Sequence, residues 1–159
     1  MQRVTNCILL NGNEVLLLQK PSKGWWVAPG GKMEPGESVR ESVIREYKEE
    51  TGLQIMNPQV KGIFTIVIEE AGKVISEWMM FTFVATEYKG TMLEESPEGE
   101  LEWKQLEEVK HLPMAEGDTF YFEHLLTWKD KEPLIGTFYY TPEFTLLSYR
   151  LHPNPQNKS

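Results

Sequence analysis

The chain contains a single cysteine, Cys7, among its 159 residues. One cysteine cannot form an intrachain disulfide, so we expect a reducing, cytoplasmic location. Long apolar runs are missing as well, because residues 15–18 form one of the longest, well short of the ~18 residues that span a bilayer. The first residues also lack the apolar stretch and the small-residue cleavage site of a signal peptide. These absences argue against an exported or membrane-spanning protein.

Positive charge is also scarce in this sequence. Lys and Arg total 16 against 24 Asp and Glu, which gives a formal net charge of −8. The basic residues are scattered and form no stripe, so duplex nucleic acid and anionic membrane surfaces would be repelled. We therefore expect a small-molecule ligand rather than nucleic acid or a membrane. The sequence carries no indication of an oligomeric state.

The length is that of one domain. We expect this domain to cover residues 1–151, and we expect residues 152–159, rich in Pro, Asn, Gln and Lys, to be a disordered tail. Turn residues and apolar patterns predict strands at 5–10, 14–19, 60–69, 74–87, 134–140 and 144–151, and helices at 38–51 and 119–129. This order predicts an α+β fold in which helices pack on a mixed sheet.

Capping signals support both predicted helices. Ser38 followed by Glu41 is the sequence of a capping box, and Gly52 suits the position just after the end of the first helix. Asp118 is the expected N-cap of the second helix. The segment around Gly30, by contrast, is expected to break regular structure.

The helix predicted at 38–51 carries acidic residues on the face that should be buried. Its apolar stripe consists of Val39, Val43 and Tyr47. Glu46 and Glu50 continue that stripe and Glu49 lies on its flank, whereas Arg45 falls on the opposite side of the helical wheel. Buried carboxylates are costly without a positive partner, and the wheel predicts that Arg45 points away from Glu46.

A divalent cation would satisfy these carboxylates. Glu46, Glu49 and Glu50 lie three or four residues apart, so we expect them to converge on one point. Oxygen ligands without His or Cys select Mg²⁺, or alternatively Mn²⁺. Gly30 and Gly31 let a ligand approach the backbone closely, which fits a metal or substrate loop beside the helix.

These residues together resemble a known motif. The pattern is G-x5-E-x7-R-E-U-x-E-E-x-G-U, the Nudix box, in which U is a bulky aliphatic residue. Its fixed identities are matched at the correct spacing by Gly31, Glu37, Arg45, Glu46, Glu49, Glu50 and Gly52. Tyr47 departs from the pattern in the first U position. The resemblance implies the Nudix fold, a mixed central sheet sandwiched between helices, and Mg²⁺-dependent hydrolysis of a nucleoside diphosphate linked to another group.

The resemblance also implies roles for individual residues. Glu46, Glu49 and Glu50 would bind metal and act in catalysis, with Glu46 or Glu49 as the base, and the carbonyl of Gly30 would join the metal shell. Glu37 and Arg45 would tie the glycine loop to the helix, with Gly31 and Gly52 as structural glycines. A carboxylate from a downstream loop would complete the site, for which Glu98 is preferred over Glu100.

Beyond the box the chain resembles the MutT-like triphosphatases that sanitise oxidised purine nucleotides. This resemblance implies hydrolysis of a nucleoside triphosphate such as 8-oxo-dGTP to the monophosphate and pyrophosphate. The resemblance implies that Asp118 reads the base, unless Asp118 only caps its helix. Lys32, directly after Gly31, is placed to reach a phosphate, unless it is only a surface lysine. Trp26 and Trp78 are candidates for stacking on the base.

Two other functions stay open from the sequence. One is a Nudix pyrophosphatase for a different substrate, either a general nucleoside triphosphate or a nucleotide sugar. The other is a non-catalytic module that senses nucleotides. The presence of Glu46, Glu49 and Glu50 argues against the sensing module, because sensing does not require all three.

Overall fold

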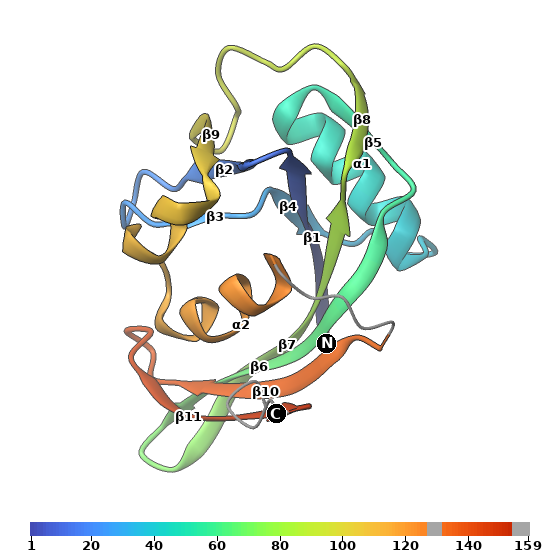
Figure 1. Ribbon diagram of the computed structural model, residues 1–159. Helices are drawn as coiled ribbons and strands as arrows, with labels where there is room; N and C mark the ends of the chain where they lie inside the picture. The colour runs from blue at the N-terminus through green and yellow to red at the C-terminus, as the bar shows by residue number, and fades with distance from the viewer. Residues whose placement is uncertain (127–131, 154–159) are drawn as a thin grey trace.

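The structure is a computed structural model that describes residues 1–126 and 132–153 (Figure 1). Its elements in chain order are β1 (Gln2–Asn11), β2 (Glu14–Gln19), β3 (Trp26–Val27), β4 (Gly30–Lys32), α1 (Val39–Thr51), β5 (Leu53–Met56), β6 (Gln59–Glu70), β7 (Lys73–Ala85), β8 (Glu87–Gly90), β9 (Glu100–Gln105), a 3₁₀ helix (Leu106–His111), α2 (Glu116–Leu126), β10 (Leu134–Tyr140) and β11 (Leu146–His152). Of the predicted tail, His152 belongs to β11, and residues 154–159 lie outside the described residues.

The main sheet is mixed, as the sequence predicts. Its strands follow the order β11-β10-β6-β7-β1-β2-β3, with β4 paired to β1 and β9 paired to β2. β1 runs parallel to β7 and β10 runs parallel to β6, whereas the other pairs are antiparallel. A separate two-stranded sheet joins β5 to β8. The α+β class is therefore confirmed.

Helices α1 and α2 cover opposite faces of the main sheet (Figure 1). Along β1, Cys7 and Leu9 pack in the apolar cluster that contains Val43 and Tyr47 of α1. Ile8, between them, packs in the cluster that contains three residues of α2. Successive side chains of a strand point to opposite faces, so the central strands are apolar on both sides. Each fully buried aliphatic side chain contributes about 1.5–3 kcal/mol.

The ends of α1 are fixed as predicted. The Ser38 side chain accepts from the Glu41 N–H and the Glu41 side chain accepts from the Ser38 N–H, which completes the capping box. At the other end, Gly52 caps the helix with a φ of 82°, in the left-handed region that favours glycine. The hydroxyls of Thr5 and Ser42 meet at 3.1 Å and join β1 to α1. These contacts set the position of the acidic helix relative to the sheet.

Two local predictions were wrong. Helix α2 begins at Glu116 instead of Thr119, so Asp118 lies inside the first turn and is not the N-cap. Its backbone N–H donates to the Ala115 carbonyl, and its side chain accepts from a tyrosine. The predicted end of that helix at Lys129 lies outside the described residues. The segment at Gly30 is not irregular but forms β4, because a glycine lets the chain approach β1: a Cβ at Gly30 would overlap the Thr5 carbonyl oxygen.

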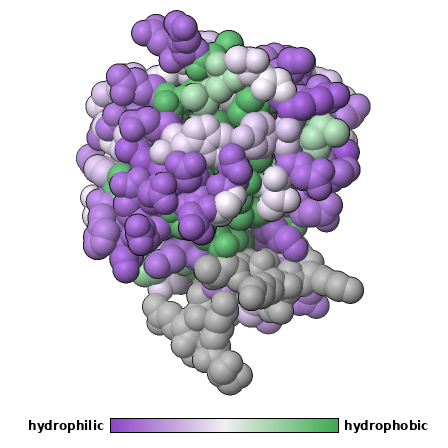
Figure 2. All heavy atoms as spheres, turned by 45° about the horizontal axis from the view of Figure 1, so that its top comes forward, coloured by the Kyte–Doolittle hydropathy of each residue, from purple (hydrophilic) through white to green (hydrophobic). Residues whose placement is uncertain are grey.

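The molecular surface agrees with the acidic composition. The face in Figure 2 is mostly hydrophilic, and apolar side chains emerge on it only in limited areas. Among the described residues, no helix is long and apolar enough to cross a membrane.

Candidate active site

Helix α1 and strand β4 form the walls of a cavity of about 480 Å³. The predicted site residues that line it are Gly30, Gly31, Lys32, Glu46, Glu49, Glu50 and Glu98. The structure thus brings together the glycine loop, the acidic helix and the acidic segment near residue 98. Lys20, just after β2, also lines the cavity and was not identified from the sequence, because no motif marks it.

Glu50 is the buried carboxylate of this cavity, with 6% of the residue exposed. Its Oε2 accepts a hydrogen bond from the Gly30 N–H at 3.1 Å. Burial raises the pKa of Glu50 to about 7; the charges of Glu98 and Glu46 raise it further, while the Gly30 N–H and Lys20 act in the opposite direction. The wheel therefore placed Glu50 correctly, and its charge is not fully balanced by the residues around it.

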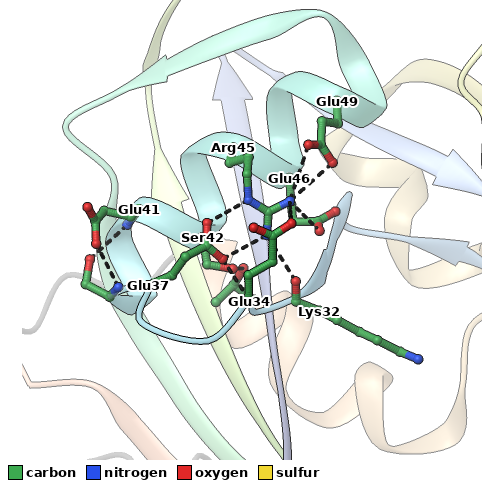
Figure 3. Close-up of polar contacts among 10 residues, drawn as sticks. Lys32, Glu34, Glu37, Glu41, Ser42, Arg45, Glu46 and Glu49 are labelled. Atoms are coloured by element: carbon green, nitrogen blue, oxygen red, sulfur yellow. Dashed lines mark hydrogen bonds and ion pairs between the residues drawn. The ribbon is translucent and has the colours of Figure 1, made fainter.

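The guanidinium of Arg45 lies at the centre of the acidic cluster (Figure 3). Nε and Nη2 bind the two oxygens of Glu37 at 2.6 and 2.8 Å, and Nη1 lies 2.9 Å from Glu46 and 3.3 Å from Glu49. Nη2 also donates to the Lys32 carbonyl. The guanidinium lowers the pKa of Glu37 to about 2, and Glu37 in turn raises the pKa of Arg45.

These contacts correct the prediction that Arg45 points away from Glu46. A helical wheel gives the direction of Cα–Cβ bonds, whereas the long arginine side chain reaches back across the helix surface. Arg45 joins α1 to the glycine loop through Glu37 and the Lys32 carbonyl. The same guanidinium neutralises part of the charge on Glu46 and Glu49.

We expected the three carboxylates of α1 to converge on one point, but in the structure they do not. Over residues 1–126 and 132–153, no three acidic, His or Cys side chains form a ready-made metal site. Arg45 holds Glu46 and Glu49, while Glu50 binds the Gly30 N–H. The donor set nevertheless fits a hard divalent cation, because the residues that line the cavity include four glutamates but no His or Cys.

Both glycines of β4 are required because neighbouring groups approach them closely. A Cβ on Gly31 would overlap the Glu46 carboxylate, whereas a Cβ on Gly30 would overlap the backbone of β1. Lys32 follows them, is exposed, and its side chain points away from Arg45 (Figure 3). Strand β4 therefore has no side chain beside Glu46, and it ends with the positively charged Lys32.

The acidic segment contributes Glu98 rather than Glu100. Glu98 lines the cavity and its Oε2 lies 3.9 Å from Lys20 Nζ. Glu100 pairs with Gln19 in the β2–β9 ladder and lines a neighbouring cleft of about 920 Å³. Lys20 and Glu98 line both cavities, so the two spaces adjoin at this ion pair.

The residues expected at the base lie on the α2 side of the sheet, outside the carboxylate cavity. Asp118 Oδ1 accepts from the Tyr121 hydroxyl at 3.0 Å, and burial raises the pKa of Asp118 to about 6. Trp26 is 6% exposed, and Lys104 Nζ lies 4.2 Å from its ring centre. Trp78 is only partly buried, so its ring is the more accessible of the two candidates.

Comparisons with known proteins agree with this geometry. The family model described as NUDIX domain matches residues 1–125. The chain is 59% identical over 153 residues to YvcI of Bacillus subtilis, described as an uncharacterized Nudix hydrolase, and covers 96% of both chains. It is 61% identical to a crystal structure of the mutator MutT protein from Bacillus halodurans, with a TM-score of 0.93, over 98% of this chain and all of that one. An oxidized purine nucleoside triphosphate hydrolase of Mus musculus is 28% identical over 150 residues, 92% of each chain.

Alanine at the two glycines should have different effects. In Gly31→Ala the new methyl group meets only the end of a flexible side chain, so the protein folds but Glu46 is displaced. A displacement of this kind costs up to about 100-fold in kcat. Gly30→Ala meets backbone and should instead lower the melting temperature. Thermal melts and pyrophosphate release on both variants test this contrast, and full activity of Gly31→Ala would contradict it.

Loss of Arg45 should lower stability and activity together. Arg45→Ala leaves Glu37 without its partner and removes the positive charge between Glu46 and Glu49. Each kcal/mol lost lowers the melting temperature by roughly 2–4 °C in a protein of this size. Arg45→Lys should restore little of the lost stability or activity, because an ammonium cannot form the bidentate hydrogen bond to Glu37. A drop in activity at unchanged melting temperature would show that Arg45 does not tie the loop to the helix.

Proposed function

Because this chain belongs to the Nudix hydrolase family and is a pyrophosphohydrolase, we propose that it cleaves a nucleoside triphosphate to the monophosphate and pyrophosphate. The proposed cofactor is Mg²⁺, with Mn²⁺ as a substitute, and the proposed substrates are oxidised purine nucleotides such as 8-oxo-dGTP. The observation that carries the proposal is the cavity that is lined by three α1 carboxylates, Glu98 and two lysines. The similarity to the mouse oxidized purine nucleoside triphosphate hydrolase supports the choice of substrate.

The geometry suggests how the reaction proceeds. The phosphate chain lies over the bare surface of Gly30 and Gly31, where Lys20 and Lys32 supply positive charge to its oxygens. Glu46, which abuts Gly31 and is less exposed than Glu49, takes a proton from the attacking water. The water oxygen bonds to phosphorus as the phosphoanhydride P–O bond breaks, and pyrophosphate leaves with the bonding electrons. When bound, Mg²⁺ offsets the phosphate charge and lowers the pKa of a bound water.

A second candidate substrate is a nucleotide sugar. One observation favours it: the neighbouring 920 Å³ cleft adjoins the cavity, and most of its lining residues are polar or charged, with no aromatic residue among them. A polar group attached beyond the phosphates could lie there. Hydrolysis assays with a panel of oxidised and normal triphosphates and nucleotide sugars, with the products identified, distinguish the two. Absence of turnover of any of them with Mg²⁺ would favour the nucleotide-sensing module.

We also propose a cytoplasmic location. The only cysteine, Cys7, has no second cysteine with which to form an intrachain disulfide, which suits a reducing compartment. The proposed substrates are free nucleotides, which such an enzyme would meet inside the cell.

Replacing Glu50 tests the metal site directly. Glu50→Gln should fold, because it removes a carboxylate whose ionised form is disfavoured by burial, and its melting temperature at pH 8 should equal or exceed that of the wild type. Turnover should fall about 100-fold or more, as for a lost charge-stabilising group. Direct titration with Mn²⁺ should also show weaker binding.

Glu41→Gln is the matched control for Glu50→Gln. Glu41 lies on the same helix, and glutamine serves equally well in a capping box. It should leave both turnover and Mn²⁺ binding unchanged. Normal Mg²⁺-dependent turnover by a folded Glu50→Gln enzyme would refute the proposed metal site.

Replacing Asp118 tests base recognition. Asp118→Ala leaves a donor of the base unpaired, at a cost of roughly 1–3 kcal/mol, and should flatten the ratio of kcat/KM for 8-oxo-dGTP to that for dGTP. The pKa of Asp118 is higher in the folded protein than its usual value, so its ionisation lowers stability as the pH rises towards and past 6. Asp118→Asn should therefore raise the melting temperature more at pH 7.5 than at pH 5. An unchanged kcat/KM ratio in Asp118→Ala would show that Asp118 has only a structural role.

A further inference from the structure

The turn between β10 and β11 carries a bulky residue where hairpins usually have glycine. The Thr141 N–H donates to the Thr145 carbonyl, and the Phe144 N–H donates to the Thr141 carbonyl, which closes a tight turn. Phe144 then adopts a φ of 64°, in the left-handed region that strains a bulky side chain. Such a conformation persists only where surrounding contacts hold it, and strained residues cluster near functional sites.

The ring of Phe144 packs against the loop that joins β2 to β3. Its centre lies 6.0 Å from that of Trp25, which it meets edge to face, and Lys23 Nζ lies 5.0 Å from the Trp25 ring and 5.7 Å from the Phe144 ring. The same ring lies 5.5 Å from Tyr140 and 6.4 Å from Trp78. Aromatic pairs and cations over rings attract at these distances. Phe144 therefore joins the strained turn to the β2–β3 loop.

The β2–β3 loop carries Lys20, which lines both the carboxylate cavity and the neighbouring cleft. The Lys20 N–H donates to the Trp25 carbonyl at 2.7 Å, and the Gly24 N–H donates to the Lys20 carbonyl at 2.8 Å. The ladder between β2 and β3 gives this loop little further support, because β3 has only two residues. A contact that holds the Trp25 ring therefore also holds the backbone of Lys20.

The position of the Lys20 charge depends on that backbone. Its Nζ lies 3.9 Å from Glu98 Oε2, and its side chain is 42% exposed. A lysine is a point charge on a flexible stem, so the place where the stem begins limits where the charge can lie. In the proposed reaction this charge acts on the phosphate oxygens. The conformation of the β2–β3 loop therefore determines how well the cation meets the substrate.

We propose that Phe144 is a positioning residue that acts through Trp25 on Lys20 and thereby strengthens phosphate binding. This inference rests on the proposed triphosphatase function, in which Lys20 contacts the phosphate chain. Phe144 is not among the residues that line the cavity or the cleft, so its effect on the reaction is indirect. The contacts of its ring offset the backbone strain of the turn, which explains why a phenylalanine occupies a position suited to glycine.

Phe144→Gly removes both the ring and the strain. It should raise KM for 8-oxo-dGTP, or for the triphosphate that the wild type hydrolyses fastest, about tenfold, while kcat changes by less than about threefold. The melting temperature should change little, because glycine suits the left-handed position. Trp25→Leu removes the same contact from the side of the loop and should have the same effect on KM. Phe144→Tyr keeps the ring and should behave as the wild type.

Two controls separate positioning from a general structural effect. Asn57→Gly places a glycine at another left-handed position, in the turn between β5 and β6, and should leave KM unchanged. Lys20→Met removes the charge itself. If Phe144 acts through Lys20, Phe144→Gly should raise KM no further in the Lys20→Met background, because the two effects are then not additive.

Hydrogen exchange of backbone amides gives a readout that does not depend on turnover. In Phe144→Gly the amides of Lys20 and Gly24 should exchange about tenfold faster, whereas those of α1 should exchange as in the wild type. The inference is overturned if Phe144→Gly keeps the wild-type KM, if the loop amides exchange as in the wild type, or if its effect on KM persists in the Lys20→Met background. If the wild type hydrolyses no nucleoside triphosphate with Mg²⁺, the proposed function itself fails, while the exchange of the loop amides still tests the link from Phe144 to Lys20.

Discussion

The charge balance of the cavity depends on how one guanidinium is shared. Arg45 binds Glu37 through two nitrogens at short distance, whereas Glu46 and Glu49 share the remaining nitrogen, Nη1. The first contact is the stronger, because two parallel charge-assisted bonds act together. The shared contacts are the weaker ones, and the proposed divalent cation would compete for the same oxygens. It would take Glu46 and Glu49 from Arg45 without releasing the contacts of Arg45 with Glu37 and Lys32, which hold the glycine loop to α1.

Glu50 is the second group that determines the charge balance of the cavity. It is buried on the core side of α1, and its partner is a backbone N–H rather than a guanidinium. Its raised pKa reflects a negative charge that burial and neighbouring carboxylates oppose. Such unbalanced carboxylates are characteristic of functional sites rather than of structural ion pairs. Below pH 7 a proton competes with any cation for Glu50, and above pH 7 the ionised carboxylate favours a cation. Without a metal, the ionised Glu50 therefore lowers the stability of the protein.

Local features of the fold and the site were predictable from the sequence, and non-local ones were not. The capping box, the glycine C-cap and the burial of Glu50 follow from spacing within one helix. The reach of Arg45 does not, because a wheel carries no information on side-chain length. The start of α2 was missed because Tyr140, far along the chain, accepts from the Gly117 N–H and completes the first turn. Lys20 belongs to no motif, and only the fold brings it, just after β2, to the cavity.

Strand β4 connects two chemically different faces of one sheet. On the α1 side the carboxylates need water, cations and a partly open cavity, whereas on the α2 side a base needs a dry surface with few polar atoms. A side chain at Gly31 would reach Glu46, and one at Gly30 would push β4 away from β1, so both positions require glycine. In the proposed function, hydrolysis and base recognition therefore lie on opposite faces of the sheet. If Asp118 reads the base as proposed, changes around it would alter the choice of base without disturbing the charges that Arg45 and Glu50 balance on the other face.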